Sequence, residues 1–307
     1  MLVYLVKRVF GIIPILLIVS ILSFMLIRLT PSDPIRIIYG NDLDKATYEK
    51  YKKLEGFDDP LIVQYGKYLY GMVTQGDFGT SYRTKSDVAG QLLERGWSTV
   101  VLTMAAMVWA IVFGLLAGII SATKRNSIWD RLGMVSTITA LSVPEFWFGM
   151  VLVQVFSVQL GWLPSGGAGS WQHLILPSLT LGLGVAAVIA RFTRASVLEV
   201  MREDYVRTAR AKGQKESVVV WSHVLRNALI PVVTMTGLQF GFLIGGASVV
   251  ESVFAYPGLG ALLVDSISSR DYPVVQALIL LFSFQFLIVN LLVDISYGLL
   301  NPQIRYE

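Results

Sequence analysis

The chain of 307 residues lacks cysteine and has only two histidines, His173 and His223. Without cysteine, disulfides, iron–sulfur clusters, zinc ribbons and thiol catalysis are all excluded. The two histidines fall on opposite sides of a predicted membrane, so they cannot share a metal ion. The sequence also contains no G-x-x-x-x-G-K-[ST], G-x-S-x-G or H-E-x-x-H motif. We find no nucleotide cradle of the P-loop type and no constellation for a membrane-embedded enzyme.

Charge is scarce as well: 15% of the residues are charged, whereas 54% are hydrophobic. A soluble domain usually carries about a quarter charged residues. Apolar runs of about 18 residues or more are long enough to cross a hydrocarbon core. The sequence therefore predicts an all-α integral membrane protein with six transmembrane helices, at about 9–27, 100–123, 132–160, 174–197, 232–253 and 274–300.

The first apolar run predicts an uncleaved span and not a signal peptide. It is long, and "RLTPSDP" follows it with no small-residue cleavage site. Lys and Arg gather in the short loops of one side, which marks that side as cytoplasmic. We therefore expect a multi-pass protein of a bacterial cytoplasmic (inner) membrane with both termini in the cytoplasm. The basic residues that set this orientation are Lys7, Arg8, Lys124, Arg125, Arg131, the cluster over 194–226, and Arg305.

The long loop over 30–99 has structure of its own. Its segments "DKATYEKYKKLEGF" and "DPLIVQYGKYLYGMVTQG" show helical apolar spacing, with breaks at Gly56, Pro60 and Gly76. We expect two or three short helices that form an extracytoplasmic cap over the first two spans. The predicted division is an N-terminal transmembrane helix (1–29), the helical cap (30–99), and a five-helix core (100–307) whose cytoplasmic loop covers about 199–231.

Acidic residues within the predicted spans are few and scattered: Glu145, Glu251 and Asp294. Secondary transporters usually carry functional intramembrane acids or broken helices in two repeated halves. We find no internal repeat, and we interpret each acid as structural. A stand-alone secondary transporter or channel therefore remains the weaker alternative to a subunit that draws its energy from a partner.

The cytoplasmic loop after the fourth span predicts a helix, a tight turn and a second helix. Asp204 opens a run of helix formers, Gly213 ends it as a C-terminal cap, and Lys212 suits the negative helix end. A second helix over about 216–227 is expected to stop before Pro231. Such a unit can dock into a groove on a cytoplasmic protein. The alternative is a topology signal that meets anionic lipid; its place after a span excludes nucleic acid.

Motifs along nearly the whole chain resemble the permeases of binding-protein-dependent ABC importers, most specifically the dipeptide, oligopeptide and nickel type. "RTARAKG" followed by "HVLRNALIP" is similar to the family's coupling loop. The other matching segments are "VKRVFGIIPILLIVSILSFMLIRLTPSDP", "DPLIVQYGKYL", "GDFGTSY", "LGWLPSGG", "HLILPSLTLG", "VVESVFAYPGLG", "RDYPVVQA" and "NLLVDISYGLLNPQIRY". Within this family the chain looks closest to glutathione and dipeptide permeases.

The loop departs from the broader pattern E-A-A-x-x-x-G followed by I-x-L-P. Ala209 and Gly213 match, while Arg207 and Thr208 replace the glutamate and the first alanine. The sequence from His223 to Arg226 stands where I-x-L-P is expected. The coupling residues implied by the resemblance are Asp204, Tyr205, Arg207, Thr208, Ala209, Arg210, Ala211, Lys212, Gly213, His223 and Arg226.

The resemblance implies a non-catalytic permease subunit of the type I importer fold, which binds no cofactor or metal itself. Its partners would be a second homologous permease, two cytoplasmic ATPase subunits that hold ATP and Mg²⁺, an extracytoplasmic binding protein and the lipid bilayer. The implied substrates are di- or oligopeptides or glutathione, with nickel or a metal chelate as the alternative. Polar residues at membrane depth are candidates for the pathway, or for hydrogen bonds between helices: Gln239, Ser248, Gln285 and Asn290.

Overall fold

The computed structural model describes residues 2–29, 33–40 and 42–300, and the regular structure of these ranges is helical apart from one β-bridge between Thr80 and Asp87. The all-α class is therefore confirmed. Arg305 and the side chain of Asp294 lie outside what is described. The long helices are α1 (Leu2–Leu29), α5 (Val88–Thr123), α8 (Gln172–Val200), α11 (Leu225–Val253) and α13 (Tyr272–Leu300). The shorter ones are α2 (Pro34–Tyr39), α3 (Lys45–Leu54), α4 (Leu61–Gln75), α6 (Ile128–Ser142), α7 (Glu145–Leu152), α9 (Asp204–Ala211), α10 (Glu216–Val218) and α12 (Leu259–Ser268).

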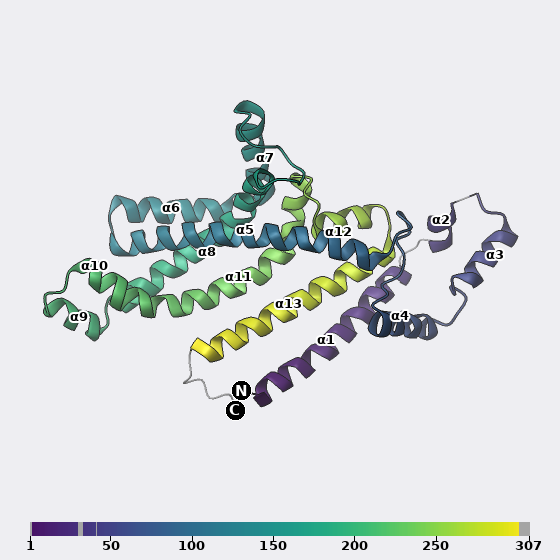
Figure 1. Ribbon diagram of the computed structural model, residues 1–307, viewed down its shortest axis with the longest axis horizontal. Coiled ribbons are helices and arrows are strands. Elements are labelled where there is room, and N and C mark those ends of the chain that lie inside the picture. Colours follow the sequence, from purple (N-terminus) through teal and green to yellow (C-terminus); the bar gives the residue numbers. More distant parts are fainter. Residues whose placement is uncertain (1, 30–32, 41, 301–307) are drawn as a thin grey trace.

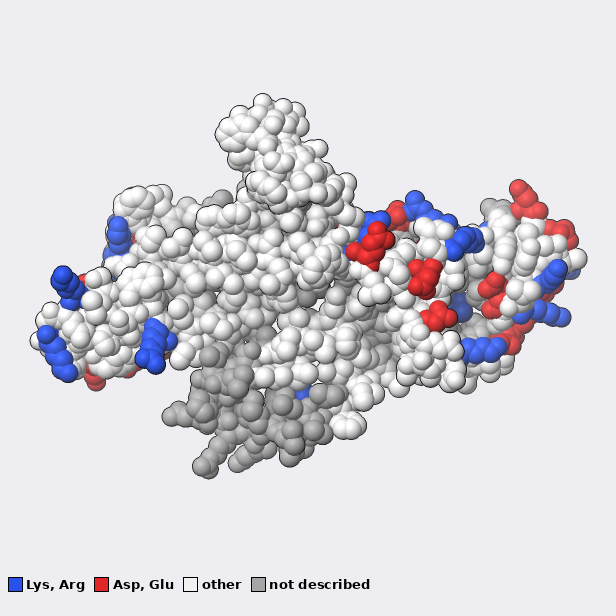
Figure 2. Space-filling view, in the orientation of Figure 1, with Lys and Arg blue, Asp and Glu red and all other residues white. Residues whose placement is uncertain are grey.

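The helices form an elongated bundle in Figure 1, with α9 and α10 at one end and α2–α4 at the other. Helices α1 and α13 lie next to each other along one flank. On the face shown in Figure 2, charged side chains gather at these two ends, and the wide middle of the bundle is nearly free of them. This distribution is what a protein needs if its middle lies in hydrocarbon and its ends lie in water.

The core of the bundle is the packing of α5, α8 and α11. Small residues allow α5 and α8 to approach closely: a Cβ on Gly118 would lie 2.6 Å from the Ala190 carbonyl oxygen, and one on Gly182 would lie 2.7 Å from that of Ala106. In membranes such contacts stabilise helix pairs, because lipid chains supply no hydrophobic force between helices. A buried cluster that includes Leu102, Leu176, Leu181, Ile189, Val250 and Phe254 fills the space among the three helices.

The predicted third span, 132–160, is not one straight helix. It breaks at Val143, whose backbone is extended, and Pro144 starts a new helix. The two halves are bent by 104°, and the π-helical segment Val153–Gln159 continues α7. Proline disfavours a helical conformation for the residue before it, which places the break at Val143. The helix expected over 132–160 is therefore interrupted, and whether its two halves form one span stays a prediction.

Four helices are long and apolar enough to cross a membrane: α5, α8, the continuous helix from Glu216 to Leu243, and α13 over Tyr272–Leu292. The bent pair α6–α7 raises this to five if it counts as one span. Helix α1 contributes a shorter apolar stretch, Phe10–Met25, within its described side chains. The count of six therefore stays a prediction. The sequence reading also missed α12, which lies between the last two predicted spans.

Three short helices, α2, α3 and α4, occupy the segment between α1 and α5. Gly56 and Gly76 adopt positive φ at the ends of α3 and α4, and Pro60 precedes α4, as the breaks in the sequence indicate. Helix α4 packs on α1, where the hydroxyls of Tyr65 and Ser20 are 2.7 Å apart. Because α5 begins at Val88, the predicted boundary between residues 99 and 100 falls inside a helix.

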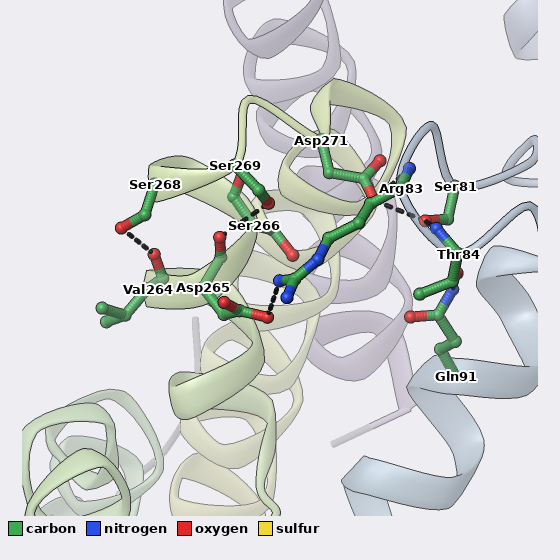
Figure 3. Close-up of polar contacts among 10 residues, drawn as sticks. All are labelled: Ser81, Arg83, Thr84, Gln91, Val264, Asp265, Ser266, Ser268, Ser269 and Asp271. Atoms are coloured by element: carbon green, nitrogen blue, oxygen red, sulfur yellow. Dashed lines mark hydrogen bonds and ion pairs between the residues drawn. The ribbon is translucent and has the colours of Figure 1, made fainter. Parts of the chain in front are cut away.

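The loop before α5 is tied to the start of α13 by one buried carboxylate. Asp271 is 3% exposed and accepts hydrogen bonds from the Ser81 hydroxyl and from the backbone N–H of Tyr82, the latter at 2.9 Å. Figure 3 shows this cluster, with the Arg83 side chain turned outward to an exposed ion pair with Asp265. Two motifs far apart in the sequence, "GDFGTSY" and "RDYPVVQA", meet here.

Candidate functional site

Helix α9 and the turn after it are defined by backbone geometry. Gly213 has φ +76°, a left-handed conformation that side chains with a Cβ adopt at a cost. Its N–H donates to the Arg210 carbonyl at 2.9 Å, and the next N–H, of Gln214, donates to Ala209 at 3.4 Å. This pair of bonds is the Schellman motif, which satisfies carbonyls left free at a helix end. The turn predicted at Gly213 is therefore present.

One face of α9 is anchored in the end of the bundle. Val206 is fully buried and Ala209 is 6% exposed. They belong to a cluster with residues of α5, α8, the π-helical segment Val219–Val224 and α11: Ala122, Val197, Val219, Val220, Val224, Leu225 and Ala228. Ala209 is small enough to bring the α9 backbone close to this cluster, so it does not belong to the exposed face. Motion of α9 therefore requires motion of the helices beneath it.

The opposite face of α9 is exposed and basic. Arg207 and Lys212 are exposed, together with Thr208 and Ala211. Arg210 spans the turn, with its Nη2 2.6 Å from Glu216 Oε1 and its Nε 3.1 Å from Oε2. These hydrogen bonds raise the pKa of Arg210 above its ordinary value. This bidentate pair connects α9 to the next helix across the turn.

Two further contacts hold the second helix against α9. The His223 Nε2 lies 2.9 Å from Gln214 Oε1, and Asn227 Nδ2 donates to the Tyr205 hydroxyl at 2.8 Å. Asp204 begins α9 and lies 3.5 Å from Arg207 in an exposed pair, and Arg226 is exposed. Of the eleven predicted loop residues, ten thus lie on the outside or in the turn, and Ala209 alone lies inward.

Pro231 does not stop the second helix. A helix runs without interruption from Glu216 through the π-helical turn into α11, and Pro231 lies inside it. The prediction of a stop before Pro231 was wrong. Membrane helices tolerate an internal proline where neighbouring helices or local π adjustments satisfy the freed backbone groups. The consequence is direct: the turn at Gly213 leads straight into α11, without an intervening loop.

An ion pair that sequence reasoning missed braces the same end of the bundle. Asp130, at the start of α6, is 4% exposed and receives two hydrogen bonds from Arg194 of α8, at 2.7 and 2.9 Å. It also accepts from the Asn126 N–H at 2.9 Å. Residues 130 and 194 are too far apart in the sequence for any local pattern to pair them.

The four polar residues predicted for the pathway are not brought together. Gln239 and Ser248 point to opposite sides of α11, because nine residues are two and a half helical turns. Ser248 packs on α12, where a Cβ on Gly260 would lie 2.3 Å from its Cα. Gln285 Oε1 is buried without a hydrogen-bond partner in the described part of the chain, and Asn290 donates to the Phe286 carbonyl of its own helix at 3.0 Å. These four residues do not share one surface.

Glu251 forms a buried polar junction. It accepts hydrogen bonds from the Thr99 hydroxyl at 2.7 Å and from the Ala261 N–H at 2.9 Å, so it caps the first turn of α12. Thr99 in turn accepts from the Leu259 N–H at 2.8 Å. Gly258 lies against the carboxylate, which a Cβ there would meet at 2.1 Å. The junction joins α5, α11 and α12, which supports the structural interpretation of Glu251.

Comparisons with known proteins identify the family of this chain. Two family models match the chain: "Binding-protein-dependent transport system inner membrane component" over residues 114–306, and the N-terminal membrane component of the same transport systems over residues 1–103. The chain belongs to this family. It is 55% identical over 307 residues, all of both chains, to the glutathione transport system permease protein GsiC of Escherichia coli K12 and of Shigella dysenteriae serotype 1 (strain Sd197).

Solved transporters share the fold at low sequence identity. An inward-facing structure of the MetNI methionine ABC transporter aligns with a TM-score of 0.59 at 21% identity, over 68% of this chain and 96% of that one. The structure titled an amino acid ABC transporter with histidines aligns with a TM-score of 0.56 at 14% identity, over 68% and 93%. This chain is thus a multi-pass inner-membrane permease subunit of an ABC importer. The family implies, in general terms, a partner ATPase and a substrate-binding protein.

Proposed function

We propose that this chain is one of two homologous permease subunits in an importer that takes up glutathione and other short peptides. The proposed substrate class rests on the 55% identity, over the whole of both chains, to glutathione transport permeases. The alignment covers 100% of each chain. Each surface of this chain that would contact a binding protein, a second permease or an ATPase therefore has an aligned counterpart in the glutathione permeases.

Coupling to ATP is assigned to α9 and its turn. Two cytoplasmic ATPase subunits hold ATP and Mg²⁺, one of them receives the exposed basic face of α9, and this chain binds no cofactor. Burial of Val206 and Ala209 supports this role, because a helix anchored in the bundle end transmits a push to α5, α8 and α11. The brace of Arg210 with Glu216 makes α9 and the following helix move as one unit. A mechanism of this kind needs two discrete states that both ends can bias.

The orientation follows from the same assignment. The end that carries α9 and the Asp130–Arg194 pair faces the cytoplasm, and we assign both termini to the same side of the membrane. The end that carries α2–α4 and α12 faces outward and receives the substrate-loaded binding protein. The prevalence of Lys and Arg over Asp and Glu at the α9 end of the face in Figure 2 supports this direction.

The pathway is assigned to a cavity of about 330 Å³ between α5 and α11, in place of the four polar residues predicted from the sequence. Met104, Met107, Val233, Thr234, Thr236, Gly237 and Phe240 line it. It is largely apolar, and Met104 is half exposed beside it. The lining residues come from α5 and α11, and we assign the rest of the wall to the second permease. The mixture of methionine, threonine and glycine supports passage of varied peptide side chains.

The decisive experiment measures ATP hydrolysis by the complete complex in lipid nanodiscs. The purified binding protein is added empty, or loaded with glutathione, a dipeptide or a nickel chelate. We expect glutathione or the dipeptide to stimulate hydrolysis over the empty protein, and nickel to leave it unchanged. Stimulation by nickel alone would overturn the substrate class. Absence of any copurifying ATPase would overturn the wider assignment.

A further inference from the structure

Two cavities lie one beyond the other along α1, α4 and α13, and the proposed transport cycle uses neither. The first is a pocket of about 530 Å³ at the outer ends of these helices, closed by α2 and the loop over 76–87. The second is a groove of about 420 Å³ farther along the same three helices. Phe78 lines both cavities, so they adjoin each other.

The pocket holds a cation, Arg28. The guanidinium of Arg28 lies over the rings of Phe24 and Phe57, at 5.0 and 4.8 Å from their centroids. Its Nε is buried without a hydrogen-bond partner, and Tyr82 is its polar neighbour. Within the described part of the chain no aspartate or glutamate forms an ion pair with it. A cation that is partly buried in this way favours an anionic ligand.

A second cation and a buried amide add to this preference. Lys85 lines the pocket, where its Nζ donates to the Ile38 carbonyl at 3.0 Å. Glu55 is the one carboxylate among the described lining residues, and it already accepts from the Tyr39 hydroxyl at 2.7 Å. Gln276 is more than nine-tenths buried, and its Nε2 makes no well-aligned hydrogen bond in the described ranges, with the Tyr68 hydroxyl as its polar neighbour. An anionic oxygen would satisfy this donor.

The groove has the opposite character. Apart from Ser20, its lining side chains are apolar or aromatic, among them Leu17 of α1, Met72 of α4 and Leu280 of α13. It opens to the surface, since Ile13 and Phe284 on its rim are about half exposed. Both residues belong to apolar stretches, Phe10–Met25 of α1 and Tyr272–Leu292 of α13. A groove that opens toward lipid accommodates an acyl chain.

The two cavities together match the length of one lipid. Arg28 and Ile13 lie on the same helix, about 22 Å apart at 1.5 Å per residue. One leaflet, with its headgroup layer, is also about 20–22 Å thick. The cation therefore lies where a headgroup belongs, and the groove lies where the chains belong. A small soluble anion would use the pocket alone and would leave the groove without a role.

We propose that this surface binds an acidic phospholipid of the leaflet on the α2–α4 side, with its phosphate at Arg28, Lys85 and Gln276 and an acyl chain in the groove. The lipid would join α4 to α1 and α13. This inference does not depend on the transported substrate. It concerns the protein's own lipid, and its failure would leave the proposed import function untouched.

The test is native mass spectrometry of the full-length chain, with whatever subunits copurify, in a mild detergent. The probes are dioleoylphosphatidylglycerol and its zwitterionic counterpart dioleoylphosphatidylcholine. We expect the acidic lipid to be retained about tenfold more strongly, the scale expected from one or two basic side chains at an anionic surface. Equal retention of the two lipids by the unmodified protein would overturn the proposal.

Variants distinguish binding of the lipid headgroup from binding of the acyl chain. Arg28→Gln is expected to remove the preference for the acidic lipid, while Arg36→Gln, an exposed arginine of α2 outside both cavities, keeps it. Leu280→Trp fills the groove and is expected to weaken both lipids. If Arg28→Gln fails to fold, the lipid pair and Leu280→Trp still decide the question. Displacement of the acidic lipid by sn-glycerol 3-phosphate at comparable concentration would show a small-anion pocket and would overturn the proposal.

Discussion

Gly213 sets the direction of the turn between α9 and the helix that continues into α11. Its φ of +76° lies in the left-handed region, and a Cβ there would have no atom within 4 Å. Any cost of substitution therefore comes from the backbone and not from a clash. That distinction makes the residue a clean probe of the turn itself.

Gly213→Val is expected to abolish substrate-stimulated ATP hydrolysis while the protein still assembles in the membrane. A β-branched residue in the left-handed region costs about 1–2 kcal/mol, which shifts the turn and with it the exposed face of α9. Gly213→Asn is the matched control, because asparagine adopts this conformation readily. Stimulated hydrolysis is measured in nanodiscs, and assembly by copurification of the ATPase. A valine variant with normal stimulation would remove α9 from the coupling path.

Single residues also show which contacts can be predicted from the sequence and which cannot. The turn at Gly213 follows from local chemistry, since helix formers, a glycine and a basic residue are adjacent in the chain. The partners of Glu251 and Asp130 do not follow, because Thr99, Ala261 and Arg194 come from other helices. A buried carboxylate in a membrane protein signals either function or structure. The donors that decide between the two are known only once the helices are packed.

At the scale of elements, three prolines lie inside helices and one breaks a helix. Pro14, Pro177 and Pro231 are internal to α1, α8 and α11, whereas the chain bends by 104° at Pro144. The residue before each of these prolines is apolar, so this neighbour does not distinguish them. After the bend, Gly149 packs on Phe254 and Thr180, contacts that a straight helix would lose. Tertiary packing decides where a proline bends a span.

The hydrogen bonds of Asp271 connect the loop over 76–87 to the start of α13, and their contribution to stability can be tested. Asp271→Asn is expected to reduce the free energy of unfolding by about 1–3 kcal/mol, because an amide nitrogen replaces an acceptor for buried donors. The matched control is Asp265→Asn, whose exposed pair with Arg83 contributes little in water. Thermal unfolding in detergent should show a lower Tm for the first variant only. Equal Tm values would mean that Asp271 does not hold the loop in place.

At the scale of the whole molecule, the composition of the sequence predicts a membrane protein, and the distribution of Lys and Arg predicts its orientation in the membrane. The uncharged middle of the bundle and its charged ends reproduce what the apolar runs and basic loops predict (Figure 2). The relative positions of α1, α4 and α13 do not follow in the same way. They depend on aromatic contacts such as that of Phe24 with Tyr65, whose ring centroids are 5.4 Å apart. No periodic pattern in the sequence predicts which of these segments will be in contact.

The absence of cysteine makes the orientation directly measurable. A single cysteine can be placed at Lys50 on α3 or at Lys215 in the turn after α9, both exposed. A membrane-impermeant maleimide added to spheroplasts should label Lys50→Cys about tenfold faster than Lys215→Cys, because positive loops stay in the cytoplasm. After permeabilisation both should react, and Val108→Cys in the apolar middle of α5 should stay unlabelled throughout. The reverse order would place α9 outside, where no ATPase could reach it, and would refute the coupling role together with the orientation.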